Sequence, residues 1–347
     1  MRLERREHVP LAFRVGAPFG AVIIALVISA GLIVPTHVPI VDAYRRLAIA
    51  AFGSRLSLTE TLLRATPLIF TGLSVAVAFR AQLWNIGAEG QLYMGALAAA
   101  ALGSAASSPP IVIIPMILLA GAAAGMATLL APVALRLKFG VDEAITGLLL
   151  NFIVLLFVRM MLEGPMKDPM AFGWPHSVPV DTDAMLPNLI SRSRLHVGFL
   201  IAIATAIIVW VIQTRTILGF EGRAAGLNAS AANFAGISLP SVMIKVALMS
   251  GGLAGLAGAI EVTGVKGFVT TDLSPGYGYT GIVVAMLAGL HPLAVVLAAL
   301  FVASIFVGAD GMSRSTGIPS FIADVIVAVS LITMLLALLI ANYRIRK

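Results

Sequence analysis

Residues 90–135 read GQLYMGALAAAALGSAASSPPIVIIPMILLAGAAAGMATLLAPVAL and contain no Asp, Glu, Lys or Arg. A helix needs about 20 apolar residues to cross the hydrocarbon core of a bilayer, so this stretch is long enough for two crossings, one on each side of Pro109-Pro110. In lipid every backbone donor and acceptor must be paired within the protein, so apolar runs of this length must be helical. The stretch therefore predicts an all-α protein that spans a membrane.

The composition supports the same class of protein. Of the 347 residues, 59% are hydrophobic and 11% are charged, and the mean hydropathy is +1.02. Soluble domains carry about 25% charged residues, which they need to cover their surface. The net charge of +7 does not indicate a nucleic-acid partner, because the Lys and Arg residues border the apolar runs and there set the orientation of the spans. The absence of cysteine excludes disulfides and Cys-ligated metals.

We predict about ten transmembrane helices, with an even number of spans and both termini in the cytoplasm. The first apolar run is too long for the core of a signal peptide, so we interpret it as a retained helix. Three arginines in the 36–59 loop (Arg45, Arg46 and Arg55) conflict with this orientation, because the loop falls on the outer side. The predicted spans cover residues 15–35, 60–80, 88–107, 111–134, 143–162, 195–213, 241–262, 276–291, 292–310 and 320–341.

Two segments are predicted to lie outside the membrane within a single transmembrane domain, 1–347. Residues 163–194 contain five prolines, which break helices, and form an extracytoplasmic loop. Residues 214–240 form a cytoplasmic loop between two spans. Within the spans, Gly121-xxx-Gly125 and Gly251-xxx-Gly255 predict closely packed helices.

Common catalytic and metal-binding motifs are absent from the sequence. The five histidines are never paired at helical spacing, so no zinc motif is present. No lysine is followed by Ser or Thr, so the chain has no P-loop, and no G-x-S-x-G elbow occurs. We therefore expect no catalytic residue, no bound metal and no enzymatic activity. Energy for uphill transport would have to come from a partner or from an ion gradient.

A short helix is predicted in the cytoplasmic loop. Asn228 is a good N-cap, residues 229–235 are mostly helix formers, and Gly236 supplies the stop. A helix of about two turns is marginal in water on its own, so it needs a surface to pack against. Phe234 and the alanine face could dock on a partner, or the helix could rest on the protein's own cytoplasmic face.

Polar residues at membrane depth are the candidates for a solute route. Asn85, Glu89 and Gln91 open the third predicted span, where a charged group normally faces the bundle interior or a wet cavity. The alternative is that they cap a helix at the interface. Asn151 could bind solute or bridge two helices. Tyr277 and Tyr279 could anchor the chain at the interface or stack on a base or sugar.

Three more acids and a lysine have plainer predicted roles. Glu261, Lys266 and Asp272 are predicted to form a solvated rim at the outer end of the seventh span, where a binding protein could dock. Asp324 is predicted to be a buried acid that pairs within the last span.

Part of the predicted cytoplasmic loop resembles the coupling loop of permeases of ABC importers for simple sugars, nucleosides and branched-chain amino acids. The matching residues are Gly226-x-Asn228-x-x-Ala231-Ala232-x-x-Ala235-Gly236-Ile237. Two further stretches are similar to the nucleoside branch of this family, which takes guanosine and other purines. One is Asn85-Ile86-Gly87-Ala88-Glu89-Gly90-Gln91, and the other is Asp142-Glu143-Ala144-Ile145 with Leu150-Asn151-Phe152. The resemblance runs from about Glu60 to the C-terminus. It implies a type II ABC importer-like permease whose coupling helix sits in a cleft of the ATPase subunit. The residues implied for coupling are Glu221, Arg223, Gly226, Asn228, Ala231, Ala232, Phe234 and Gly236.

The function implied by the resemblance is transport across the bacterial inner membrane. The chain would pair with a second permease and two ATPase subunits, which bind the ATP and Mg, and would receive solute from an extracytoplasmic binding protein. A nucleoside is the first expectation for the solute and a simple sugar the second. The alternative is an ion-coupled secondary transporter that uses Glu89 or Asp324 as an ion site. A passive channel is disfavoured, because no selectivity filter is recognisable.

Overall fold

The computed structural model describes residues 2–5, 11–105 and 108–346, and most of these residues are helical. The helices are α1 (Leu11–Ile33), α2 (Ile40–Phe52), α3 (Arg55–Arg80), α4 (Ala88–Gly103), α5 (Pro110–Phe139), α6 (Glu143–Glu163), α7 (Gly198–Arg215), α8 (Ile217–Leu227), α9 (Ala229–Phe234), α10 (Leu239–Glu261), α11 (Tyr277–Leu287), α12 (Pro292–Thr316) and α13 (Ile322–Asn342). Short 3₁₀ turns cover Val34–Thr36 and Thr182–Ala184, and a π-helical turn, η3, covers Val262–Lys266. Strand β1 (Arg2–Arg5) pairs antiparallel with β2 (Tyr343–Arg346). The predicted all-α class is confirmed.

The predicted number of ten spans is not confirmed. Six helices in the described residues are long and apolar enough to cross a membrane, or seven if the end of α1 and α2, which meet at 112°, count as one bent span. Each of the ten predicted segments does contain a helix. However, α4 has 16 residues and α11 has 11. At 1.5 Å per residue they are about 24 Å and 16 Å long, less than the hydrocarbon thickness of about 30 Å.

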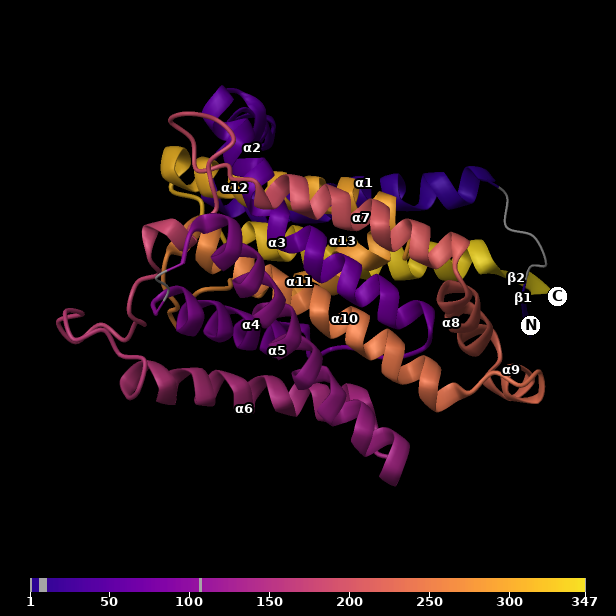
Figure 1. The fold of residues 1–347 in the computed structure, drawn as a ribbon. Helices are drawn as coiled ribbons and strands as arrows, with labels where there is room; N and C mark the ends of the chain where they lie inside the picture. The colour runs from indigo at the N-terminus through magenta and orange to yellow at the C-terminus, as the bar shows by residue number, and fades with distance from the viewer. Residues whose placement is uncertain (1, 6–10, 106–107, 347) are drawn as a thin grey trace.

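Helix α3 lies at the centre of the bundle, and 89% of its apolar window is buried. It packs on α11 and α12, while α10, which contacts α3, packs on α4 and α5. The contact of α10 with α4 and α5 depends on glycine, as predicted: a Cβ on Gly255 would collide with the backbone of α5. A second, smaller core joins α2, α12 and α13 to the end of α1. The arrangement is visible in Figure 1.

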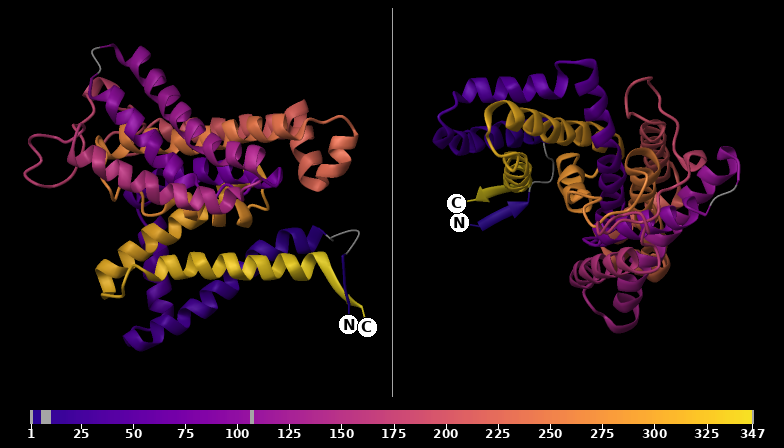
Figure 2. Two further views of the ribbon diagram at one scale, coloured as in Figure 1. Left: turned by 90° about the horizontal axis from the view of Figure 1, so that it is seen from below. Right: turned by 90° about the vertical axis from the view of Figure 1, so that its left-hand side faces the viewer.

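The two ends of the bundle carry different segments. Helices α8 and α9 lie at the same end as both chain termini, and α2 lies at the opposite end with the loop that follows α6 (Figure 1). Figure 2 shows the two termini side by side, next to one end of α13. This placement agrees with an orientation in which both termini share one side of the membrane. Among the basic residues near the two termini, Arg6 and Lys347 lie outside the described residues.

Helix α2 carries two of the three arginines that conflict with the predicted orientation, and the third, Arg55, is the first residue of α3. Arg45 and Arg46 belong to this helix, which turns by 112° from α1 and exposes Val41, Ile49 and Phe52. At about 3.6 residues per turn, Arg45 lies between Phe52 and Ile49 on the exposed face of the helix. Arg45 and Arg46 therefore lie on a helix rather than on a loop.

The proline-rich segment between α6 and α7 is held in place by three isolated β-bridges: Lys167 with Ser177, His176 with Thr270, and Asn188 with His196. Burial lowers the pKa of His196 to about 4, so its ring is neutral and Nδ1 accepts the N–H of Gly198 at 3.1 Å. The segment is thus tied to the start of α7 and to the loop that precedes α11.

Candidate functional site

The amides of Asn85 and Gln91 bind each other inside the bundle. Gln91 Nε2 donates to Asn85 Oδ1 at 2.7 Å, and Asn85 Nδ2 donates to Gln91 Oε1 at 3.0 Å. Asn85 Nδ2 also lies 2.9 Å from the hydroxyl of Ser250 on α10, which in turn donates to the carbonyl of Ser74 on α3. Both amide side chains are buried. The segment between α3 and α4 is therefore fixed to the two central helices.

The first turns of α4 and α11 meet at Glu89. Its carboxylate accepts the N–H of Gly278, at the start of α11, at 2.6 Å. A Cβ on Gly278 would collide with the backbone of Glu89, so only glycine permits this approach. Glu89 is buried, and an acid at a helix N-terminus satisfies an unpaired N–H and complements the helix dipole. Glu89 thus joins two short helices end to end.

Asn151 on α6 binds the backbone at the start of α4. Its Oδ1 accepts the N–H of Gly90 at 2.9 Å, and its Nδ2 donates to the carbonyl of Ile86 and to the hydroxyl of Tyr279, each at 3.1 Å. The structure therefore brings Asn85, Glu89, Gln91, Asn151 and Tyr279 together around the start of α4. Tyr277, two residues before Tyr279, lines a separate cavity.

We expect Glu89→Ala to reduce transport about tenfold while the transporter still assembles, because it leaves the buried N–H of Gly278 without an acceptor. Glu89→Gln keeps an acceptor oxygen and should retain most of the activity. Initial uptake rates in proteoliposomes, with subunit ratios measured on the same preparation, distinguish the two variants. Wild-type transport by Glu89→Ala would mean that the contact is dispensable.

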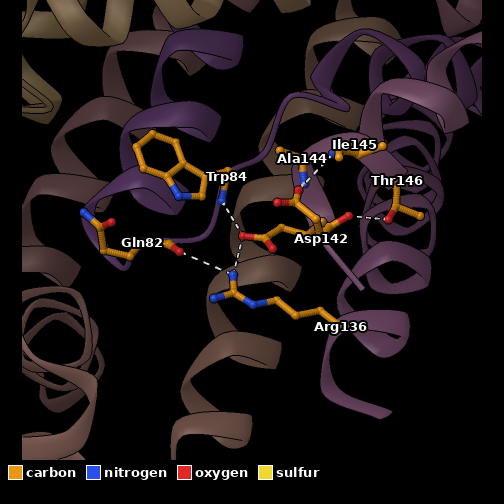
Figure 3. A network of polar contacts seen from close by, with 8 residues as sticks. Gln82, Trp84, Arg136, Asp142, Ala144, Ile145 and Thr146 are labelled. Carbon is orange, nitrogen blue, oxygen red and sulfur yellow. Dashed lines mark hydrogen bonds and ion pairs between the residues drawn. The ribbon is translucent and has the colours of Figure 1, made fainter. Parts of the chain in front are cut away.

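An ionic network joins the end of α5 to the start of α6 (Figure 3). Arg136, near the end of α5, pairs with Glu143 at the start of α6, and Glu143 also accepts the N–H of Trp84 at 3.1 Å. Asp142 caps α6 by accepting the N–H groups of Ala144 and Ile145. The network ties the segment before α4 to the α5–α6 turn. The sequence contains Asp142-Glu143, but nothing in it identifies Arg136 as the partner.

The loop predicted to be cytoplasmic, 214–240, contains two helices rather than one. The predicted short helix is α9, and Asn228 Oδ1 accepts the N–H of Ala231 at 3.0 Å, as expected for an N-cap. Gly236, which follows, has φ +86°, where glycine is favoured. The additional helix, α8, was not predicted. It packs on the last turn of α3, where a Cβ on Gly226 would collide with the carbonyl of Arg80.

The faces of α8 and α9 differ in exposure. Phe234 is 97% exposed and Leu227 is also exposed, whereas Ala232 is only 4% exposed. The prediction that Ala232 belongs to a docking face is therefore wrong for this alanine, because it packs against the chain itself; Ala231 is exposed. Of the charged residues, Glu221 lies 3.7 Å from Lys245, and Arg223 donates to the carbonyl of Gln213.

Residues 57–340 match the family described as the permease component of branched-chain amino acid transport systems. This match covers most of the chain. The chain belongs to this permease family. It is accordingly a multi-pass membrane subunit of an ABC transporter, in which separate ATPase subunits hydrolyse ATP, so the permease is not itself an enzyme. ATPase subunits and a second permease subunit are its implied partners.

Three relatives resemble the permease along nearly its whole length. A glucose ABC transporter permease of Haloferax volcanii is 35% identical, over 99% of this chain and 93% of the relative. A guanosine ABC transporter permease of Bacillus subtilis is 34% identical, over 90% of each chain. A nucleoside ABC transporter permease of Lactococcus lactis is 32% identical, over 91% of this chain and 89% of the relative. No solved structure matches.

Two of the plainer predictions need correction. Glu261 was expected on a solvated rim with Lys266 and Asp272, but it is buried, because the end of α10 and η3 carry it into the bundle wall. Asp324 was expected to be buried but is exposed in the first turn of α13. The family assignment also removes the reason for the ion-coupled alternative, in which Asp324 would have held an ion within the membrane.

Proposed function

We propose that this permease imports a nucleoside or a simple sugar across the bacterial cytoplasmic membrane, after delivery by an extracytoplasmic binding protein. The observation that carries the proposal is the similarity, along nearly the full length of the chain, to permeases named for glucose, guanosine and nucleosides. The permease itself would bind no cofactor, and ATP and Mg would stay on the ATPase subunits.

The coupling to ATP hydrolysis would run through α8 and α9. These helices lie at the end of the bundle that carries the termini, and they present Leu227 and Phe234 to the surroundings. Large exposed apolar side chains at one end of a subunit favour a protein partner. Closure of the ATPase dimer would move α9, and the bundle would exchange between outward-open and inward-open states. We propose that Glu221, Arg223, Gly226, Asn228, Ala231, Phe234 and Gly236 form or support this contact, with Ala232 seating α9 on the chain.

The solute route would pass the start of α4 and α11. Because Asn85, Gln91 and Glu89 already satisfy one another or the backbone, their proposed role is to hold the irregular segments that border the route. Tyr279 is partly exposed and Tyr277 lines a cavity, so these two side chains are placed to meet solute. Irregular backbone at membrane depth is tolerated where it lines a cavity or is buried in protein.

The test is uptake by the transporter reconstituted in proteoliposomes with its ATPase subunits, second permease and binding protein. We expect tritiated guanosine or glucose to accumulate only when ATP is enclosed and the binding protein is present. A catalytically inactive ATPase variant is the control and should abolish accumulation. Uptake driven by a proton or sodium gradient without ATP would contradict the proposal and restore the ion-coupled alternative.

A further inference from the structure

A polar cavity of about 260 Å³ opens at the outer end of the bundle, between the first half of α3, the end of α10 with η3, and the loop before α11. With about 30 Å³ per water molecule in the liquid, it has room for roughly eight waters, comparable to a sugar ring with its hydroxyls. Its wall includes η3, and π-helical turns occur frequently at functional sites. The cavity ends at Tyr277, the first residue of α11, beside the contact between Gly278 and Glu89.

The wall carries a buried carboxylate that has no partner among the described residues. Glu261 is 5% exposed, lines the cavity, and makes no hydrogen bond or ion pair within the described part of the chain. Its oxygens remain accessible from the cavity. Among the described residues, the fully enclosed side-chain atoms without a hydrogen bond are His196 Nε2 and Thr270 Oγ1, not the Glu261 carboxylate. Tyr277 is 6% exposed, and its hydroxyl faces the guanidinium of Arg64. Buried polar groups normally have partners, so Glu261 is placed to bind something that enters the cavity, with Tyr277 on the same wall.

The charges of the lining residues nearly cancel. Three acids (Glu60, Glu261 and Asp272) face three cations (Arg64, Arg194 and Lys266). Two of the cations are already paired: Arg194 makes two hydrogen bonds to Glu60, at 2.8 and 3.2 Å, and Arg64 binds Asp310 on α12 at 2.6 Å. Counted with Asp310, four acids stand against three cations, so the surroundings of the cavity do not attract anions. The cavity favours a neutral solute with many polar groups.

We propose that this cavity binds the vicinal diol of a neutral sugar ring, whether ribosyl or glucosyl, through Glu261 and Tyr277. Two hydroxyls on adjacent carbons can both donate to one carboxylate, and charge-assisted hydrogen bonds of this kind are stronger than neutral ones. A hydroxyl can also accept from Tyr277 or Lys266. The inference rests on the proposed function, because it names the group shared by nucleosides and simple sugars. It places a low-affinity site on the permease itself, apart from any binding protein.

The absence of cysteine from the chain allows a direct test. Val265→Cys places one thiol in the cavity wall of the assembled transporter, and the rate at which a water-soluble maleimide modifies this chain reports access. If the Kd is about 1 mM, about 10 mM uridine or glucose should occupy about 90% of the sites and slow labelling about tenfold. Loss of one charge-assisted hydrogen bond weakens binding about tenfold, so 2′-deoxyuridine should slow labelling only about twofold. Whether uridine or glucose protects better identifies the ring.

Glu261→Gln in the Val265→Cys background should remove the protection while leaving the labelling rate without solute unchanged. Glu163→Gln is the control, since this acid is exposed at the outer end of α6 and pairs with Arg159. If Glu261→Gln does not assemble, Tyr277→Phe keeps the ring and should still reduce the protection. Equal protection by uridine and 2′-deoxyuridine, or full protection in the Glu261→Gln protein, would overturn the inference. If the transporter takes up nucleoside but solute gives no protection, this site is refuted and the proposed function stands. If solute protects the thiol but no ATP-driven uptake occurs, the proposed function is refuted and the site stands.

Discussion

A permease with Phe234→Glu is expected to lose its ATPase subunits during purification and to lose ATP-driven uptake with them. Phe234 is the most exposed large side chain on α9, a helix of six residues that cannot be stable without support. Buried aromatic anchors contribute about 2 kcal/mol or more to an interface, which is about 30-fold in the dissociation constant. A carboxylate at this position would add the cost of desolvating a charge.

The measurement is the amount of ATPase that copurifies with a tagged permease, followed by binding-protein-stimulated ATP hydrolysis. Phe172→Glu is a matched control, because Phe172 is equally exposed but lies on the loop after α6, at the opposite end of the bundle. It should leave association unchanged. Ala232→Glu is a poorer probe, since a buried alanine reports on the seating of α9 as well as on the partner. Normal association of the Phe234→Glu protein would place the ATPase contact elsewhere.

Gly255→Val should prevent the permease from accumulating in the membrane. Helices α4, α5 and α10 meet at Gly255: a Cβ there would collide with Gly121 on α5, and a Cβ on Gly95 of α4 would collide with Gly255 itself. Overpacking typically costs about 1–3 kcal/mol and more when backbone must move, as it must here because the obstructing atoms are main-chain atoms. The helices would separate, and the contacts of α10 with both neighbours would be lost.

The yield of this variant in the membrane fraction and its elution profile in detergent measure the effect. Gly31→Val is the control. Gly31 also lies in an apolar helix, α1, but nothing lies within 4 Å of the position a Cβ would take. Wild-type yield and profile for Gly255→Val would mean that the three helices are packed less closely than the structure has them.

Local sequence patterns predicted the features that depend on neighbouring residues. Long uncharged runs predicted membrane helices, and Asn228 followed by alanines predicted the capped helix α9. Helix α8 was missed because Gly219, Gly222 and Gly226 lower its intrinsic helix propensity. Those glycines are tolerated because two of them pack closely on neighbouring backbone, which no local pattern reveals.

The partners of the polar residues could not be predicted, because they are far apart in the chain. The Glu89–Gly278 bond joins positions 189 residues apart, and Asn85 meets Ser250 over 165 residues. A glutamate and an asparagine in an apolar sequence indicate only that some partner must exist. For Glu261 the sequence indicated a helix end, and helix ends are usually exposed. Its burial depends on how the end of α10 and η3 pack in the bundle wall, which no local pattern reveals.

The chain of caps from Asn151 to α4, and from Glu89 to α11, restricts how the subunit can move. If α4, α6 or α11 slid past a neighbour by one turn, backbone N–H groups would be exposed where lipid offers no acceptor, at several kcal/mol for each group. Tilting the linked helices together breaks none of these bonds. We therefore expect the subunit to move as a rigid body. Its hinge would lie at the interface with the second permease subunit rather than within its own bundle.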